Sequence, residues 1–155
     1  MIHLLLLSGD ISTNPGPYQN LDNLQPNNIW LPFRKKGLHI THLNINSLLP
    51  KLDEIRNFIK HAKPTVFGIT ESKLDDSVSN SEIEINEYAV IRSDRNRHGG
   101  GVACFIKKDI CFQIHDFLSK EIEGIVFDIL LPKTKPITVG IFYRPPDQYN
   151  FLEIL

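Results

Sequence analysis

"LHITHLNINSLLPKLDEIRNFIKHAKPTVFGIT", residues 38–70, is the stretch that decides the fold. It opens with an apolar, β-branched run, 38–45, and closes with a second one, 65–70, and both are typical of buried strands. Between the two runs, apolar residues recur at a helical spacing, at Leu52, Ile55, Ile59 and Ala62. The order strand, helix, strand predicts a β-α-β unit.

Downstream of this unit the sequence is richer in strands. We expect one pair of strands at 88–94 and 101–108, joined by a basic, glycine-rich turn, and a second pair at 123–132 and 136–145. The last residues, 149–155, are typical of the first turns of a helix. These elements predict a mixed α/β (α+β) body in which helices cover layered sheets.

Composition sets the broad class of the protein. The chain has 155 residues, of which 41% are hydrophobic and 23% charged, as expected for one globular domain. Its net charge of −1 provides no overall basic field for a polyanion, so any contact with nucleic acid has to come from local clusters. The two cysteines, Cys104 and Cys111, match no zinc pattern.

The beginning of the chain has a different texture. Residues 1–37 contain prolines and asparagines with little apolar periodicity, so we expect a mostly disordered leader before a body at 38–155. The apolar run at Leu4–Leu7 is shorter than the core of a secretory signal, and no stretch is long enough to span a membrane. We therefore expect a nuclear or cytoplasmic protein without a membrane partner.

Two polar residues follow buried strands at the places where sites are built in α/β layers. Asn44 ends the first run, and Glu71 follows the second. If the two strands are neighbours, an amide oxygen and a carboxylate lie side by side, which suits a hard cation such as Mg²⁺. Lys73 can pair with Glu71 or reach a phosphate. The alternative is that Asn44 caps the following helix and that Glu71 is an ordinary loop residue.

Two further segments carry groups that bind phosphate. Tyr143 and Arg144 end the last strand, and a phenol and an arginine fork both suit a phosphate oxygen. The basic turn carries Arg95 and Arg97, which can contact a phosphate backbone. The alternatives are strand aromatics with a surface arginine, and a solvated basic loop whose glycines, Gly99–Gly101, serve the hairpin.

Taken in order, "LNINSL…ITESKL…RHGGGVA…FYRPP" resembles the endonuclease/exonuclease/phosphatase superfamily, and most closely the endonuclease domain of LINE-type non-LTR retrotransposons. The resemblance covers about residues 38–155. It implies a four-layered α/β sandwich of the deoxyribonuclease I-like type. It also implies hydrolysis of DNA phosphodiester bonds with Mg²⁺ (or Mn²⁺), a nick that primes reverse transcription, and a reverse transcriptase domain C-terminal to the endonuclease.

The resemblance assigns roles to individual residues. It implies that Asn44 organises the metal site and the nucleophile, that Glu71 binds the metal, and that Tyr143 lies near the scissile phosphate. Arg144 occupies a position that is often an arginine in this group. Neither the Asp-x-Asn that the family carries on a later strand nor its Ser-Asp-His occurs after Tyr143 in the sequence. We therefore expect the N-terminal half of an endonuclease domain, inactive alone. A non-catalytic nucleic-acid-binding or interaction module and a phosphatase of the same superfamily are the alternatives.

The stretch "LLLLSGDISTNPGP", Leu4–Pro17, resembles the ribosome-skipping peptides of picornaviruses, which also precede some non-LTR retrotransposon proteins. Ser12 stands where the pattern usually has glutamate. If the peptide works, synthesis separates between Gly16 and Pro17. The alternative is a Pro-Gly turn in a disordered leader. The residues that match the pattern are Asp10, Asn14, Pro15, Gly16 and Pro17.

Overall fold

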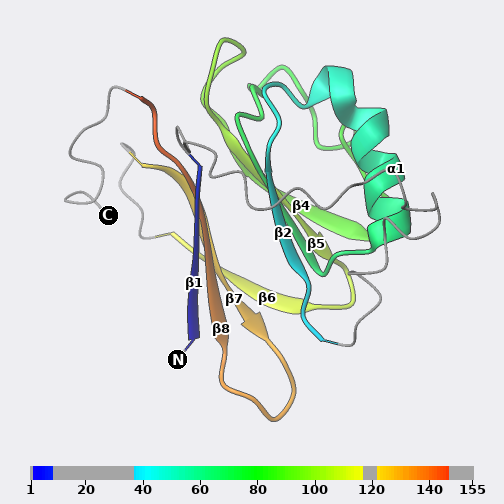
Figure 1. Cartoon of the computed structure of the whole chain (residues 1–155), viewed down its shortest axis with the longest axis vertical. Coiled ribbons are helices and arrows are strands. Elements are labelled where there is room, and N and C mark those ends of the chain that lie inside the picture. Colours follow the sequence, from blue (N-terminus) through cyan, green and yellow to red (C-terminus); the bar gives the residue numbers. More distant parts are fainter. Residues whose placement is uncertain (1, 9–36, 117–121, 147–155) are drawn as a thin grey trace, which may run out of the picture.

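The computed structural model of the chain describes residues 2–8, 37–116 and 122–146. In this part of the chain, two four-stranded sheets lie face to face, and one helix, α1 (Leu52–Ala62), covers the outer face of one of them (Figure 1). The helix-covered sheet has the strand order β2-β3-β5-β4, and the opposite sheet has the order β1-β8-β7-β6. The described residues thus form three layers of an α/β sandwich.

The strands of both sheets fall largely within the predicted runs. β2 and β3 pair in parallel and are connected through α1, which confirms the β-α-β unit, and β5 pairs antiparallel with both β3 and β4. β1 and β6 were not predicted. The bounds are β1 (Ile2–Ser8), β2 (Ile40–Asn44), β3 (Val66–Thr70), β4 (Tyr88–Ser93), β5 (Val102–Lys107), β6 (Cys111–His115), β7 (Glu123–Leu130) and β8 (Ile137–Tyr143).

Helix α1 is amphipathic as its sequence predicts. A 3₁₀ turn at Leu49–Lys51, which contains Pro50, leads into the helix, and Lys63 ends it in the left-handed conformation. Burying an Ile or Leu side chain contributes roughly 1.5–3 kcal/mol, so the apolar stripe anchors α1 to its sheet. The four residues of the stripe, Leu52, Ile55, Ile59 and Ala62, are all buried.

Strand β3 has all five of its residues buried because it is covered on both faces. Phe67 and Ile69 belong to the core under α1, while Val66 belongs to the core between the two sheets. Gly68 faces Ile141 of β8, and a Cβ at this position would lie 2.7 Å from Ile141 Cδ1. The glycine therefore allows the two sheets to approach closely.

The first residues of the chain form a strand that the sequence analysis did not predict within its mostly disordered leader, 1–37. The backbone of Ile2–Ser8 forms β1, which pairs in parallel with β8 from Ile2 opposite Ile137 to Ser8 opposite Tyr143. The physical reason is that a short apolar run suits an extended strand that covers an edge of a sheet. Residues 9–36, with the skipping-like motif, and the predicted helix at 149–155 lie outside the described residues.

Candidate functional site

The pair formed by Asn44 and Glu71 lies where β2 and β3 end. Asn44 is opposite Thr70 in the parallel register, so the residue after Thr70 falls beside it. Asn44 Nδ2 donates a hydrogen bond of 2.9 Å to Glu71 Oε1. The structure therefore places the amide and the carboxylate side by side, as expected for neighbouring strands. Their proposed role in metal binding stays a prediction.

The backbone at these strand ends takes an uncommon conformation. Asn46, Ser47, Glu71 and Lys73 all have positive φ, between 47° and 83°. Ser47 N donates to Glu71 O at 2.8 Å, so the two loops hydrogen-bond to each other beyond the last ladder pair. Non-glycine residues held at positive φ cost of order 1–3 kcal/mol each and concentrate at functional sites. All four residues lie in the two loops that follow β2 and β3.

The strand end also corrects one detail of the sequence analysis. β2 ends at Asn44, and Asn46 belongs to the turn that follows. Lys73 Nζ donates to Asn46 Oδ1, so Lys73 is fixed by Asn46 and forms no ion pair with Glu71. Lys51 Nζ donates to the carbonyls of Ile45 and Asn46 and secures the same turn.

Tyr143 reaches this pair from the opposite sheet. It is the last residue of β8 and is 7% exposed. Burial raises the pKa of the phenol, the carboxylates of Glu71 and Glu123 and a hydrogen bond to Glu71 raise it further, and Arg95 opposes them. Asn44 thus hydrogen-bonds to Glu71 within one sheet, and the phenol of Tyr143 lies close enough from the other sheet for the Glu71 carboxylate to raise its pKa.

The basic, glycine-rich turn lies against the loop that follows Glu71. Ser72 N donates to Gly101 O at 3.1 Å, and Lys73 N donates to Gly100 O at 3.0 Å. Gly100 and Gly101 have φ values of 68° and 82°, which side chains disfavour. The glycines therefore serve the turn before β5, as the alternative interpretation of this segment expected, and they also hold the Glu71 loop in place.

Glu123 is a site residue that the sequence analysis missed. It begins β7 and is opposite Tyr143 in the register of β7 with β8. Its Oε1 accepts a hydrogen bond of 2.7 Å from Arg95 Nη1, and its Oε2 accepts one of 2.7 Å from Gly101 N. A glutamate at the start of a buried strand was the available signal, but only the strand register shows that it lies beside Tyr143.

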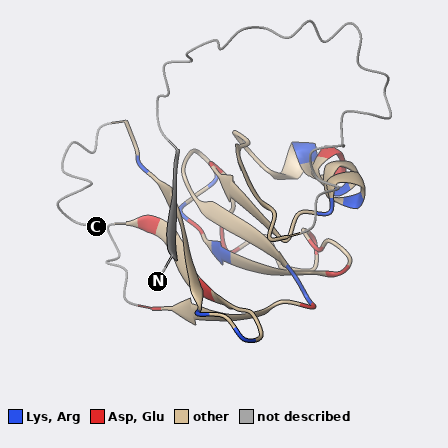
Figure 2. Cartoon of the chain, turned by 60° about the horizontal axis from the view of Figure 1, so that its bottom comes forward, with Lys and Arg blue, Asp and Glu red and all other residues tan. Residues whose placement is uncertain are grey.

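The four cations expected to bind phosphate have different surroundings. Arg95 is held by Glu123, and Lys73 by Asn46, both next to the site. Arg144 follows Tyr143 directly and is exposed. Arg97 is directed elsewhere, since its Nε lies 3.2 Å from Asp75 Oδ2 and its Nη2 donates to Ser77 Oγ at 2.7 Å. Along the described part of the chain, Lys and Arg positions are interspersed with Asp and Glu positions (Figure 2).

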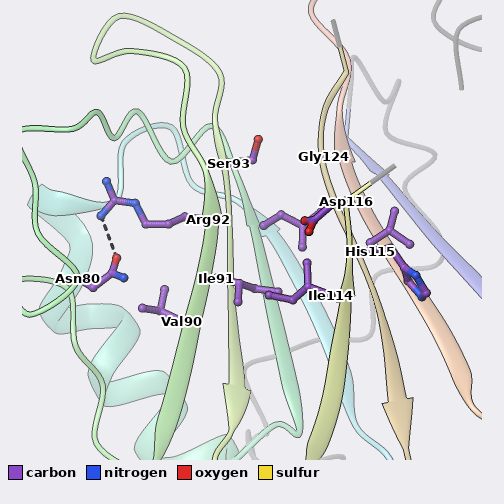
Figure 3. A pocket seen from close by; sticks show the side chains of 11 residues that line it. Asn80, Val90, Ile91, Arg92, Ser93, Ile114, His115, Asp116 and Gly124 are labelled. Atoms are coloured by element: carbon purple, nitrogen blue, oxygen red, sulfur yellow. Dashed lines mark hydrogen bonds between the residues drawn. The ribbon is translucent and has the colours of Figure 1, made fainter. Parts of the chain in front are cut away.

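A separate cavity of about 520 Å³ lies between β4 of one sheet and β6 and β7 of the other (Figure 3). Ile91 and Ile114 contribute apolar walls, and His115 and Asp116 contribute polar groups. Arg92, which also lines the cavity, is fully engaged by Asp94, Asn80 and backbone carbonyls. Asn44, Glu71 and Tyr143 do not line this cavity, so it is distinct from the site they form.

The chemistry of the donor set determines which ligand can be held. A carboxylate beside an amide suits Mg²⁺, which takes one or two carboxylates and keeps several waters. In the described part of the chain, no group of three or more His, Cys, Asp and Glu side chains could hold a metal ion. Glu71 and Asn44 therefore fit part of a Mg²⁺ site rather than a complete protein cage.

The chain was compared with protein-family models, curated protein sequences and solved structures, and only solved structures are similar to it. No protein-family model and no curated protein sequence matches the chain. Among solved structures, the AP endonuclease LMAP from Leishmania major is similar with a TM-score of 0.51 and 17% identity, over 68% of this chain and 39% of that one. Truncated TDP2 from Caenorhabditis elegans is similar with a TM-score of 0.50 and 10% identity, over 73% of this chain and 48% of that one.

These similarities establish the fold. The chain shares the α+β fold of these two structures, which confirms the predicted deoxyribonuclease I-like fold class. It spans less than half the length of either solved structure. Among the described residues, the one α-helix lacks the length and apolar character needed to cross a membrane.

Proposed function

We propose that this chain carries part of the active site of a hydrolase that nicks DNA phosphodiester bonds with Mg²⁺ (or Mn²⁺). The observation that carries the proposal is the convergence on Glu71. Asn44 donates to its carboxylate from the neighbouring strand, and the phenol of Tyr143, on the opposite sheet, lies close enough for this carboxylate to raise its pKa. A carboxylate held in one orientation by hydrogen bonds is the kind of ligand that metal sites use.

Each residue of the site has a role in this proposal. Glu71 and the amide oxygen of Asn44 would hold the cation, which supplies stabilisation of negative charge on the phosphate and on the leaving oxygen. A phenol is protonated at neutral pH, and the raised pKa of Tyr143 extends this to more alkaline pH, so the hydroxyl can donate to a phosphate oxygen. Asn44 would also orient groups around the phosphate.

The cations around the site would bind the DNA backbone. Arg144 is exposed beside Tyr143, and Lys73 and Arg95 are held by neighbours at the edge of the site. An arginine fork matches two phosphate oxygens. Arg97 lies further along the basic turn, paired with Asp75, and would contact DNA only by exchanging that pair for a phosphate.

We expect the 155-residue chain to be inactive alone. Hydrolysis requires a base that activates the attacking water, and neither the family's Ser-Asp-His nor the Asp-x-Asn of its later strand occurs after Tyr143 in the sequence. The described residues also hold no cluster of three or more acidic, His or Cys side chains at Glu71. The body at 38–155 would thus act as one part of a larger site.

The test combines metal binding with DNA nicking. Mn²⁺ titrations followed by paramagnetic broadening should show weakening of about 10-fold or more in Glu71→Gln. Glu54→Gln is the matched control, since Glu54 is an exposed residue in the first turn of α1. Equal Mn²⁺ affinity in Glu71→Gln and the unmodified chain would refute the proposed metal ligand.

A supercoiled-plasmid assay with Mg²⁺ tests the expected inactivity. Nicking by the unmodified chain that Glu71→Gln abolishes would overturn it. Metal-independent DNA binding that Glu71→Gln leaves unchanged would favour a non-catalytic nucleic-acid-binding module. Release of phosphate from a small phosphorylated substrate would favour a phosphatase.

The retrotransposon role belongs to the same proposal. It places the protein in the nucleus or cytoplasm, with DNA as substrate and a reverse transcriptase domain further along the same reading frame. Its support is the order of the "LNINSL", "ITESKL", "GGGVA" and "YRPP" motifs. Sequencing the reading frame past Leu155 tests it, because a continuation without Asp-x-Asn, Ser-Asp-His or reverse transcriptase sequence would contradict this role.

Ribosome skipping at Gly16–Pro17 is proposed on the sequence motif alone, which lies outside the described residues. A reporter that carries residues 1–17 between two fluorescent proteins should give two separate products. Pro17→Ala is the matched control, because alanine lacks the hindered ring nitrogen that disfavours the last peptide bond. A single full-length product from the unmodified reporter would reject the proposal.

A further inference from the structure

Glu123 connects the two sheets at the site. It belongs to β7, in the sheet of Tyr143, but both of its carboxylate oxygens bind the glycine-rich turn of the other sheet. Its side chain is only 16% exposed, and the Arg95 side chain that it binds is 39% exposed. A carboxylate that is partly buried and accepts two hydrogen bonds, one of them from a guanidinium, is fixed more firmly than an exposed ion pair.

The contacts continue from Glu123 to the metal-binding candidate. Gly101 N donates to Glu123, and Gly101 O accepts from Ser72 N, the residue after Glu71. Gly100 O accepts from Lys73 N in the same way. A continuous series of hydrogen bonds therefore runs from the start of β7, through the glycine-rich turn, to the loop that orients Glu71.

The packing at this point leaves little freedom. A Cβ placed on Gly100 would lie 2.2 Å from Glu123 Oε2 and 2.7 Å from Arg95 Nε. The carboxylate therefore rests directly on the backbone of the turn, with the guanidinium beside it. Glu123 is also opposite Tyr143 in the strand register, and residues directly opposite share one face of a sheet.

We infer that Glu123 is a positioning residue that fixes the Glu71 loop of one sheet relative to Tyr143 of the other. It acts through Arg95 and Gly101 and does not itself need to touch metal or phosphate. The inference rests on the proposed function, because that function makes Glu71 the metal-binding part of the site and Tyr143 the phosphate-binding part. The alignment itself is tested independently of activity.

Amide hydrogen exchange of the full chain tests the alignment. In Glu123→Gln, one of the two accepted hydrogen bonds is lost, so the amides of Gly101, Ser72 and Lys73 should exchange about 10-fold faster. The amides at the centres of β3 and β5 should keep their rates. The matched control is Glu84→Gln, which removes an exposed ion pair, Lys108 Nζ to Glu84 Oε1 at 3.6 Å, that involves no residue of this turn.

Two results of this exchange experiment would overturn the inference. One is unchanged exchange at Ser72 and Lys73 in Glu123→Gln. The other is a uniform increase over both sheets, which indicates a general loss of stability. Glu123→Ala, which removes both hydrogen bonds, should give the same local pattern with a larger increase, and a fold check by circular dichroism accompanies each variant.

Mn²⁺ affinity separates a positioning residue from a merely structural one. If Glu123 aligns the site, Glu123→Gln should weaken Mn²⁺ binding about 10-fold, as loss of groups that orient metal ligands does elsewhere, while Glu84→Gln should not. Faster exchange with unchanged Mn²⁺ affinity would make Glu123 a structural residue and overturn the inference. Absence of Mn²⁺ binding by the unmodified chain would instead refute the proposed function, and the exchange pattern would then decide the alignment alone.

Discussion

Tyr88 fastens the start of β4 to the segment that joins α1 to β3. Its hydroxyl donates a hydrogen bond of 2.7 Å to Pro64 O, and the residue is 5% exposed. Burial, with smaller contributions from Glu87 and Asp109, raises the pKa of Tyr88 to about 12. An unfolded tyrosine titrates near pH 10, so this interaction is fully present below that pH. Stability is then lost as the pH rises from about 10 to about 12, because only the unfolded state releases the proton.

We predict that Tyr88→Phe lowers the free energy of unfolding by about 1 kcal/mol at pH 8, the contribution of one buried hydrogen bond. It should also reduce the decline in stability between pH 10 and 12. Urea unfolding at pH 8 and pH 11 measures both effects. A difference between the unmodified chain and Tyr88→Phe that is the same at both pH values would contradict the assigned cause of the shift.

At the scale of the element, the residue that caps the C-terminal end of α1 has a backbone conformation that a lysine disfavours. Lys63 has φ 49° and ψ 48°, and its N–H donates to Ile59 O at 2.9 Å. Glycine is preferred at such left-handed helix ends because it has no Cβ. We predict that Lys63→Gly raises the free energy of unfolding by about 0.5–1 kcal/mol.

A glycine inside the same helix should have the opposite effect. Lys60→Gly, at an exposed position in the last turn, should lower the free energy of unfolding by about 1 kcal/mol. Urea unfolding of both variants under one condition gives the comparison. If Lys63→Gly destabilised the chain as Lys60→Gly does, the strained end of α1 would not be a source of instability.

The elements that the sequence predicted are those with a strong local pattern. The apolar stripe of α1 indicates a helix that is buried on one face. The continuous apolar run of β3 indicates a strand that is buried on both faces. β6 was missed because it lies at the edge of its sheet, and Cys111, Gln113 and Ile114 are exposed, which leaves no clear alternation. β1 was missed because its partner, β8, is over 120 residues away, roughly the length of a domain, and a local pattern does not report such pairing.

In the candidate site, too, some residues could be predicted from a local sequence pattern and others could not. Asn44 and Glu71 could be predicted because both directly follow apolar runs, and their contact follows from parallel pairing of the two strands. Glu123 could not, because its position beside Tyr143 depends on the register of β7 with β8, and its hydrogen bonds depend on how the two sheets face each other. Residues that join two sheets are specified by the tertiary structure and not by a local pattern.

At the scale of the whole molecule, β1 protects an edge of a sheet, whereas ribosome skipping would remove β1 from the body. β1 pairs along β8 from Ile137 to Tyr143, so it covers an edge of the sheet that carries the site tyrosine. Separation between Gly16 and Pro17 would leave β1 on the upstream product. The body that begins at Pro17 would then present the N–H and C=O groups of β8 as an unpaired edge, which favours association with other strands.

We predict that a chain of residues 17–155 self-associates at concentrations where the full chain stays monomeric. Sedimentation velocity over a range of concentrations measures this, with the full chain as the reference. Thr138→Lys in the shorter chain should reduce the association, because a lysine on an exposed strand edge disfavours pairing. The shorter chain could also remain monomeric and unfold cooperatively. That result would contradict the prediction, because it would show that pairing with β1 is not needed to keep β8 from associating with other strands. Skipping would then leave the folded body intact.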